Sequence, residues 1–198
     1  MLNINKGAEP AFFAEFKKQA KPKEWKDLSP VTTELRQYLL KNEQTPTGVA
    51  LCTYCEKKIT LEGSQIDHIR PKALSGKYAH LFADYDNLTA ICKSTASCGQ
   101  TKDRAYDEDF INPVEENPAD FMTYKFDTAH IIPLKEAVKK RVERTCEILR
   151  LNSCFELVNA RKKILNTLFT KPDKGAAIVD HYKEFPSLID FYRRVFLA

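Results

Sequence analysis

Four of the six cysteines occur as two close pairs. Cys52 and Cys55 have two residues between them, and Cys92 and Cys98 have five. Two thiolates on a tight turn can share one tetrahedral ion, and two such turns complete a four-sulfur zinc site. The spacing therefore predicts a closed, structural zinc site. The alternatives are four unrelated core cysteines, or a redox pair that lacks the usual thioredoxin-like strand and helix.

The composition is that of a cytoplasmic globular protein. The chain has 198 residues, of which 43% are hydrophobic and 29% charged, so it can bury an ordinary core. The first residues lead into no apolar signal segment, and no apolar run approaches the ~18 residues of a membrane span. In a reducing compartment, closely spaced cysteines bind metal more often than they pair. The net charge of +4 does not by itself indicate nucleic-acid binding.

A second group of polar residues lies between the cysteine pairs. Asp67 and His68 follow a short segment in which apolar and polar residues alternate, and Pro71 is consistent with a strand that ends there. Asn87 comes after a loop. Neither the Asp-His dipeptide nor the asparagine is informative alone. Their placement between the two cysteine pairs resembles the HNH nuclease motif and its ββα-metal fold.

This resemblance implies metal-dependent hydrolysis of phosphodiester bonds. Asp67 would offer a carboxylate oxygen to Mg²⁺ or Mn²⁺, which prefer oxygen ligands. His68 would be the general base that deprotonates the attacking water, since imidazole titrates near neutral pH. Asn87 would orient the histidine or its loop through hydrogen bonds. Arg70 and Lys72 could hold phosphates, although a solvated loop explains them equally well.

The sequence departs from the HNH pattern at one position. Many HNH sequences have a histidine or asparagine directly after the last cysteine, three residues before a lysine, as a further ligand of the catalytic metal. Here Lys102 is present, but the position holds Gly99, which has no side chain to bind with. Gln100 could offer an amide oxygen instead, Asp103 is a further possibility, and water could also fill the position.

Structural roles are expected for the remaining cysteines and histidines. Cys146 and Cys154 have apolar neighbours, and a free cysteine behaves as a small hydrophobe, so both are expected in the core. No motif surrounds the other histidines, which are His80, His130 and His181. For His68 the structural alternative is an ordinary core histidine at the end of a strand.

The chain is expected to have an α+β fold, mainly helical, around the HNH core. Residues 1–48 would form an N-terminal helical and basic arm. Residues 49–112 would form the ββα-metal nuclease core with its four-cysteine zinc site. Residues 113–198 would add a β-hairpin and C-terminal helices.

The periodicity of apolar residues predicts the individual elements. Helices are expected over 10–20, 29–44, 135–151 and 186–197, with a further helix in the apolar stretch that follows residue 153. The alternation around Asp127-Thr128 predicts the hairpin over 121–134. The lysine-rich segment around Trp25 is either a solvated linker with one aromatic anchor or a basic arm that contacts phosphate or a partner.

The order of motifs is similar to that of the retron-associated and Septu-type HNH nucleases, the PtuB family of antiphage defence. It covers roughly residues 10–170 and includes LRQYLLKNEQ, CTYCEKKI, IDHIRPK, DYDNL, FINP, HIIPL and ILRLNSCFELVNARKKIL. The resemblance implies a PtuA-like ABC/SMC ATPase as partner and, in retron forms, a reverse transcriptase with its RNA–DNA product. The chain itself contains no GxxxxGK[ST] sequence, so another chain would bind any ATP.

Two functions follow from these observations. The first is a metal-dependent HNH endonuclease that cleaves nucleic acid, DNA in preference to RNA, as the effector of an antiphage system. The second is a non-catalytic, zinc-containing nucleic-acid-binding or adaptor subunit whose HNH site has decayed. Gly99 favours the second function, and the Asp67-His68 pair favours the first.

Overall fold

The computed structural model describes residues 1–73, 76–170 and 179–197. It is a mixture of helices and two small sheets, as the sequence predicts. The helices and strands are α1 Ala11–Ala20, α2 Ser29–Asn42, β1 Ser64–His68, β2 Leu88–Cys92, α3 Gly99–Lys102, β3 Met122–Tyr124, β4 Ile131–Pro133, α4 Lys139–Leu149, α5 Phe155–Thr170 and α7 Pro186–Phe196. Short 3₁₀ helices connect them, namely η1 Trp25–Leu28, η2 Ala79–Ala83, η3 Tyr85–Asn87, η4 Pro118–Asp120 and η5 Glu136–Val138.

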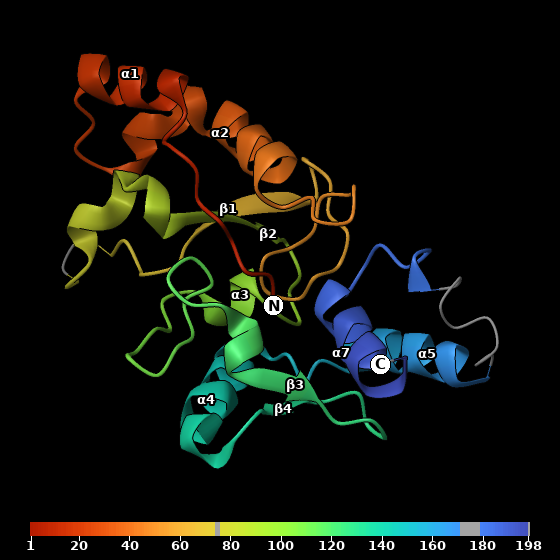
Figure 1. Cartoon of the computed structure of the whole chain (residues 1–198). Coiled ribbons are helices and arrows are strands. Elements are labelled where there is room, and N and C mark those ends of the chain that lie inside the picture. The colour runs from red at the N-terminus through yellow and green to blue at the C-terminus, as the bar shows by residue number, and fades with distance from the viewer. Residues whose placement is uncertain (74–75, 171–178, 198) are drawn as a thin grey trace.

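The N-terminal helices pack on the first sheet. Phe13 of α1 and Leu35 and Leu39 of α2 are fully buried, since each helix turns one apolar stripe inward. Figure 1 shows α1 and α2 at one end of the molecule, with β1 and β2 beside them. The lysine-rich segment between these helices contains η1, which brings Trp25 to the end of β1.

The first sheet is an antiparallel pair, β1 with β2. Asp67 lies opposite Thr89, and His68 lies opposite Leu88. Because side chains alternate along a strand, Gln65 and Asp67 share one face. Gly99, the first residue of α3, lies on that face, where a Cβ atom added to it would be 2.5 Å from Ile91 Cδ1. The short helix therefore covers the face that carries Asp67.

The second sheet is the expected hairpin of β3 and β4. Thr123 pairs with Ile132, and the turn closes through the Ala129 N–H, which donates to the Lys125 carbonyl oxygen at 2.8 Å. Near the turn, the ring of Phe126 packs edge-on against a phenylalanine of α5, with a centroid distance of 4.1 Å. This contact joins the hairpin to the C-terminal helices.

The C-terminal helices also support the segments that carry the cysteines. The last carbonyl oxygen of α4, that of Leu149, accepts a hydrogen bond from the Cys98 N–H at 3.0 Å. At the start of α7, the Ser187 N–H donates to Glu56 Oε2 at 3.0 Å, one residue after Cys55. Both cysteine pairs are therefore braced by elements far along the chain.

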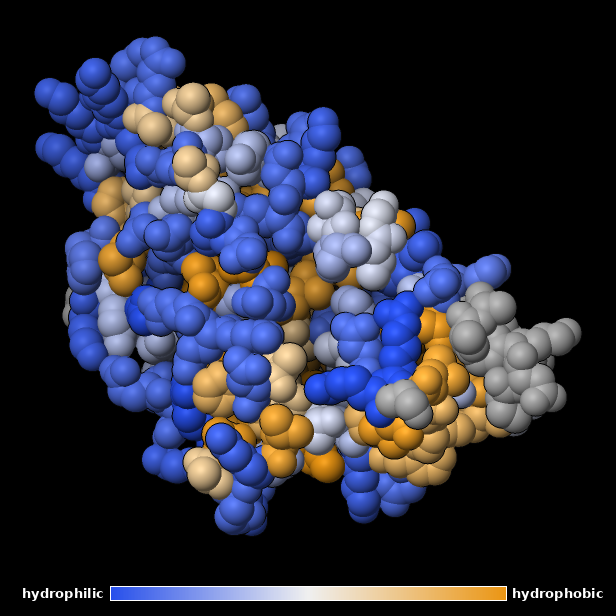
Figure 2. Space-filling view, in the orientation of Figure 1, coloured by the Kyte–Doolittle hydropathy of each residue, from blue (hydrophilic) through white to orange (hydrophobic). Residues whose placement is uncertain are grey.

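Hydrophobic residues reach the surface at the C-terminal end of the molecule. Figure 2 shows them gathered around the end of α7, and the exposed side chains there include Val195, Phe196 and Leu197. In the part of the chain that the structure describes, no helix is both long and apolar enough to cross a membrane.

A buried glutamine joins the end of α2 to the sheet and to the first cysteine pair. Gln44 is fully buried. Its Nε2 donates to the carbonyl oxygens of Leu51 at 2.7 Å and Ala90 at 2.8 Å, and its Oε1 accepts from the Ala90 N–H at 2.8 Å. A buried amide is tolerated when its donors and acceptor are satisfied. Gln44 thus fixes α2 against β2 and against the residue that precedes Cys52.

Replacing Gln44 by leucine removes these three hydrogen bonds from the interior. We expect Gln44→Leu to lower the free energy of unfolding by about 1–3 kcal/mol, the usual cost of leaving buried polar groups without partners. Urea denaturation measures the change. Gln37→Leu, at an exposed position of α2, is the matched control, and equal stability of the two variants would show that the buried amide contributes nothing.

Candidate active site and metal centre

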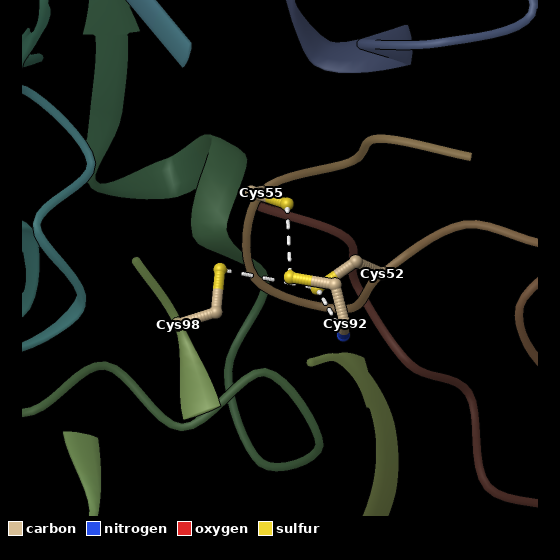
Figure 3. A group of neighbouring side chains, drawn as sticks. All are labelled: Cys52, Cys55, Cys92 and Cys98. Atoms are coloured by element: carbon tan, nitrogen blue, oxygen red, sulfur yellow. Dashed lines mark hydrogen bonds between the residues drawn. The ribbon is translucent and has the colours of Figure 1, made fainter. Parts of the chain in front are cut away.

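The side chains of Cys52, Cys55, Cys92 and Cys98 converge on one point (Figure 3). All four Sγ atoms lie within 4.8 Å of one another, with Cys52–Cys98 at 4.0 Å and Cys55–Cys92 at 3.9 Å. A tetrahedral ion with Zn–S bonds of ~2.3 Å needs S···S distances of ~3.8 Å, whereas a disulfide needs ~2.05 Å. The four thiols are therefore spaced to bind a metal ion.

Two turns of different length bring the thiols together. Main-chain hydrogen bonds close the first turn over residues 52–57. The second turn runs from Cys92, the last residue of β2, to Cys98, just before α3. Inside it, Ser94 Oγ accepts from the Ser97 N–H at 3.2 Å. The five-residue spacing, wider than usual for such a site, is therefore taken up by a folded loop.

The thiols also influence one another's ionisation. Hydrogen bonds from Cys52, Cys55 and Cys98 lower the pKa of Cys92, whereas hydrogen bonds with Cys52 and Cys92 raise the pKa of Cys55, and those with all three other thiols raise the pKa of Cys98. One thiolate is thus stabilised while further ionisation is resisted. A bound cation relieves that resistance, because a metal deprotonates the thiols that coordinate it.

The other two cysteines lie in the core, as the sequence predicts. Cys146 on α4 is buried, and burial raises the pKa of its thiol to about 12. Cys154, just before α5, is also buried, and its Sγ donates to Glu156 Oε2 at 3.3 Å. Neither belongs to the four-sulfur cluster.

A cleft of about 830 Å³ opens beside β1. Asp67 and His68 line it, so the structure brings this sequence-predicted pair into one accessible space. Four other segments contribute to its walls, through Trp25 and Lys26 from η1, Lys72 from the loop after β1, Phe82 from η2, and Gly99, Asp103 and Arg104 from α3 and the residues that follow it.

Two donors fix the Asp67 carboxylate from one side. The Tyr54 hydroxyl donates to Oδ2 at 2.6 Å, and Lys102 Nζ lies 3.2 Å from the same oxygen. Lys102 is fully buried and also donates to the His68 carbonyl oxygen at 2.9 Å. Within the described residues nothing bonds Oδ1, so this oxygen is available to a ligand in the cleft.

Sequence reasoning misses the role of Tyr54. The available signal was its position between two of the clustered cysteines, which brings its hydroxyl to Asp67 on β1. Burial and the neighbouring Asp67 raise its pKa well above the usual range, so the hydroxyl keeps its proton and acts as a donor. The spacing of Lys102 fits the HNH pattern, but its contact with Asp67 is a property of the folded chain.

The His68 imidazole is held in one tautomer. Its Nε2 lies 2.9 Å from the Phe82 carbonyl oxygen, which can only accept, so Nε2 carries the proton and Nδ1 keeps the basic lone pair. The Trp25 ring packs edge-to-face on the imidazole, with a centroid distance of 4.4 Å. Burial lowers the pKa of His68 to about 3, well below the near-neutral value expected from the sequence, so the ring is neutral at pH 7.

Asn87 holds the loop after β1. Its Oδ1 accepts from the Arg70 N–H at 2.8 Å, and its Nδ2 donates to the carbonyl oxygens of Arg70 at 3.0 Å and Leu81 at 3.2 Å. These contacts tie the segment beyond His68 to the segment that contains Phe82. Asn87 is buried and does not line the cleft, and its side-chain hydrogen bonds within the described residues go to Arg70 and Leu81.

Only some of the remaining candidates from the sequence line the cleft. Gly99 and Asp103 line it, whereas Gln100 is exposed and lies outside its walls. The side chain beside Gly99 is that of Gln65 on β1, whose Nε2 would be 2.6 Å from a Cβ atom at Gly99. The other histidines, His80, His130 and His181, are also outside the cleft walls.

The basic residues near the cleft differ in their partners. Arg70 makes a two-pronged ion pair with Glu115, with both N···O distances at 2.7 Å, and this partner raises its pKa. Lys72 is exposed, and its Nζ lies 5.7 Å from the centre of the Trp25 ring. Lys72 is therefore better placed than Arg70 to contact a phosphate group in the cleft.

Comparisons with known proteins agree with this geometry. Residues 52–104, which contain all four clustered cysteines, Asp67, His68 and Asn87, match the family model described as HNH endonuclease. This segment is similar to HNH endonuclease domains. The resemblance to HNH endonucleases that the sequence predicts is thereby confirmed for this segment.

A curated relative extends the similarity beyond this segment. It is described as a candidate HNH endonuclease of retron Vc95 from Vibrio cholerae serotype O1 biovar El Tor. The two chains are 28% identical over 128 residues, which covers 60% of each. The chain thus spans about 60% of the length of the relative that it matches. The similarity to HNH endonucleases, a retron-associated one among them, is confirmed.

The four-sulfur cluster predicts a dependence of folding on metal. We expect the purified chain to hold about one ion at this cluster and Cys52→Ser to lose it with a large fall in melting temperature, because such a site contributes folding free energy directly. Elemental analysis and thermal unfolding measure both effects. Cys146→Ser, at a buried cysteine outside the cluster, should keep its metal, and a metal-free Cys52→Ser chain with unchanged melting temperature would contradict the prediction.

The burial of His68 predicts a pH dependence of stability. Its pKa is about 3 when folded and about 6.5 in an unfolded chain, so below pH ~6.5 the unfolded chain binds a proton that the folded chain does not. The free energy of unfolding should therefore fall as pH decreases, by up to about 1.4 kcal/mol per pH unit. Urea denaturation at pH 7 and pH 5 measures this slope in the wild type and in His68→Asn. Identical slopes in both would show that His68 is not the group responsible.

Proposed function

We propose that the chain is a metal-dependent HNH endonuclease that hydrolyses phosphodiester bonds in nucleic acid, with DNA preferred to RNA. One observation carries the proposal. Asp67, with an oxygen free to bind a ligand, and His68, with its basic Nδ1, line the same cleft within the HNH-like segment. In this proposal β1, β2 and α3 form the ββα-metal element, which commonly enters a duplex groove.

The donor sets suit two kinds of metal ion. The four buried or half-buried thiols suit Zn²⁺ in a closed structural site, which leaves no position for water. Asp67 Oδ1 is a hard oxygen donor that suits Mg²⁺ or Mn²⁺. The second ion, held by Asp67, would compensate charge on the phosphate and stabilise the leaving oxygen.

His68 supplies the proton chemistry of the proposed reaction. A water molecule loses a proton to Nδ1 as its oxygen attacks phosphorus, and the bond from phosphorus to the leaving oxygen breaks. The Nε2–H bond to the Phe82 carbonyl keeps Nδ1 as the acceptor and would stabilise the imidazolium that forms. Trp25 and the loop held by Asn87 keep the ring in place.

Basic residues on the cleft walls would contact the phosphate groups of the nucleic acid. Lys26, Lys72 and Arg104 line the cleft and come from three different segments. The basic residues of α4 are less suited, because Arg141 and Arg144 are ion-paired with Glu116 and Asp107 at 2.6 Å. We therefore place the nucleic-acid backbone across the mouth of the cleft, between η1 and the loop after β1.

The biological setting of the proposal comes from resemblance. The similarity to PtuB-type proteins and the name of the Vibrio cholerae relative support an effector of cytoplasmic antiphage defence. Its partners would be a PtuA-like ABC/SMC ATPase and, in a retron, the reverse transcriptase and its RNA–DNA product. The division into 1–48, 49–112 and 113–198 agrees with this proposal, since the HNH match lies inside the middle part.

A non-catalytic role is the second candidate, and Gly99 favours it. A glycine at this position supplies no side-chain ligand, so the HNH site could have decayed in a zinc-containing nucleic-acid-binding or adaptor subunit. The two functions make opposite predictions for the histidine at the cleft.

The decisive experiment removes the proposed general base. His68→Ala should lower the rate of DNA cleavage in Mg²⁺ or Mn²⁺ by at least about 100-fold, the usual contribution of general base catalysis, while zinc content and DNA binding are kept. His80→Ala makes the same change at an exposed histidine and should cleave normally. Assays with and without the ATPase partner would detect cleavage that requires the complex. DNA binding without cleavage by the wild type in every condition would favour the adaptor instead.

A further inference from the structure

The space beside Gly99 is taken up by another side chain. A Cβ atom at Gly99 would lie 2.6 Å from Gln65 Nε2 and 2.5 Å from Ile91 Cδ1, closer than real Cβ contacts. A side chain at position 99 would therefore displace the ends of the Gln65 and Ile91 side chains. A larger residue at position 99 and the present conformation of Gln65 exclude each other.

The Gln65 amide is also placed like a ligand. Gln65 lies two residues before Asp67 on β1, on the same face, and both line the cleft. Within the described residues the Gln65 side chain makes no hydrogen bond. Its amide can therefore turn over at little cost and present Oε1 in place of Nε2. Asp67 Oδ1, on the same face, likewise has no partner there.

We propose that Gln65 Oε1 and Asp67 Oδ1 together hold the divalent ion, so that Gln65 supplies the oxygen ligand that Gly99 cannot. This inference rests on the proposed function, because it concerns the same ion. An amide and a carboxylate oxygen form a donor set suited to Mg²⁺ or Mn²⁺, with water completing the coordination. This inference also explains the glycine at position 99. The missing side chain there leaves space for the Gln65 amide, so Gly99 need not mean that the site has decayed.

Two other candidates are less well placed. Gln100 follows Gly99 directly, but its side chain is exposed and lies outside the cleft walls. Asp103 lines the cleft but follows the end of α3, four residues beyond Gly99. Gln65 differs from both, because its amide lies against Gly99 on the face that carries Asp67.

The test measures Mn²⁺ binding without nucleic acid. The zinc-loaded chain is titrated with Mn²⁺, and the free ion is followed by electron paramagnetic resonance while zinc content is checked in every variant. Gln65→Ala should weaken Mn²⁺ binding by at least about tenfold, the scale seen when groups at a metal site are removed. Gln65→Glu keeps an oxygen donor and should bind at least as tightly as the wild type. Gln100→Ala makes the same truncation one residue from Gly99 and should bind normally.

A side-chain exchange tests the steric argument. Gly99→Asn alone should bind Mn²⁺ no more tightly than the wild type, because its Cβ atom collides with the Gln65 amide and displaces it. The double variant Gln65→Ala/Gly99→Asn removes that collision and restores an amide oxygen, and it should recover most of the wild-type affinity. Ile91 must also shift, but the atom concerned is the end of a flexible side chain.

The outcomes separate this inference from the proposed function. Wild-type affinity in Gln65→Ala, together with loss of Mn²⁺ in Asp67→Ala, would overturn the role of Gln65 and leave the nuclease site intact. Loss in Gln100→Ala or Asp103→Ala but not in Gln65→Ala would assign the ligand elsewhere. An absence of Mn²⁺ binding by the wild type would overturn the metal site itself.

Discussion

The four-sulfur cluster is the constraint on which the rest of the site depends. It joins the turn after α2, the end of β2 and the start of α3, segments far apart in sequence. Cys52 and Cys55 flank Tyr54, and Cys98 precedes Lys102 by one helical turn. Both donors that orient the Asp67 carboxylate are therefore carried by the elements that the cluster holds. A structural ion here would support the cleft by positioning the groups around Asp67.

Polar groups buried around the cleft favour a defined geometry over maximal stability. Lys102 is fully buried, and burial of an ammonium group is costly unless it is paired and hydrogen-bonded. Its Nζ lies near Asp67 Oδ2 and donates to the His68 carbonyl, so one side chain fixes both cleft residues. Gln44 acts similarly beneath the sheet, where one amide satisfies backbone groups of two segments. Such networks tolerate few alternative arrangements, which would suit the proposed pairing of an ion and a base in one cleft.

Local sequence signals predict most of the elements and the identity of the principal site residues. The helices α1, α2 and α7 and the hairpin of β3 and β4 lie within one or two residues of their expected bounds, because apolar periodicity reports directly which face is buried. The cysteine pairs are equally recognisable, since two ligands on one turn are a local feature. Asp67 and His68 are adjacent in sequence, so their common placement at the end of β1 needs no tertiary information.

The sequence by itself determined the pairs of thiols, the Asp67-His68 dipeptide and the elements that carry them. Only the tertiary structure decided how these groups are oriented. Phe82 selects the basic nitrogen of His68, Tyr54 leaves one oxygen of Asp67 available, and Gln65, in place of Gln100, lies against Gly99. Periodicity and spacing describe neighbours within one element, whereas these contacts join different elements. Their partners follow from how the strands, turns and short helices pack, and no local pattern records that packing.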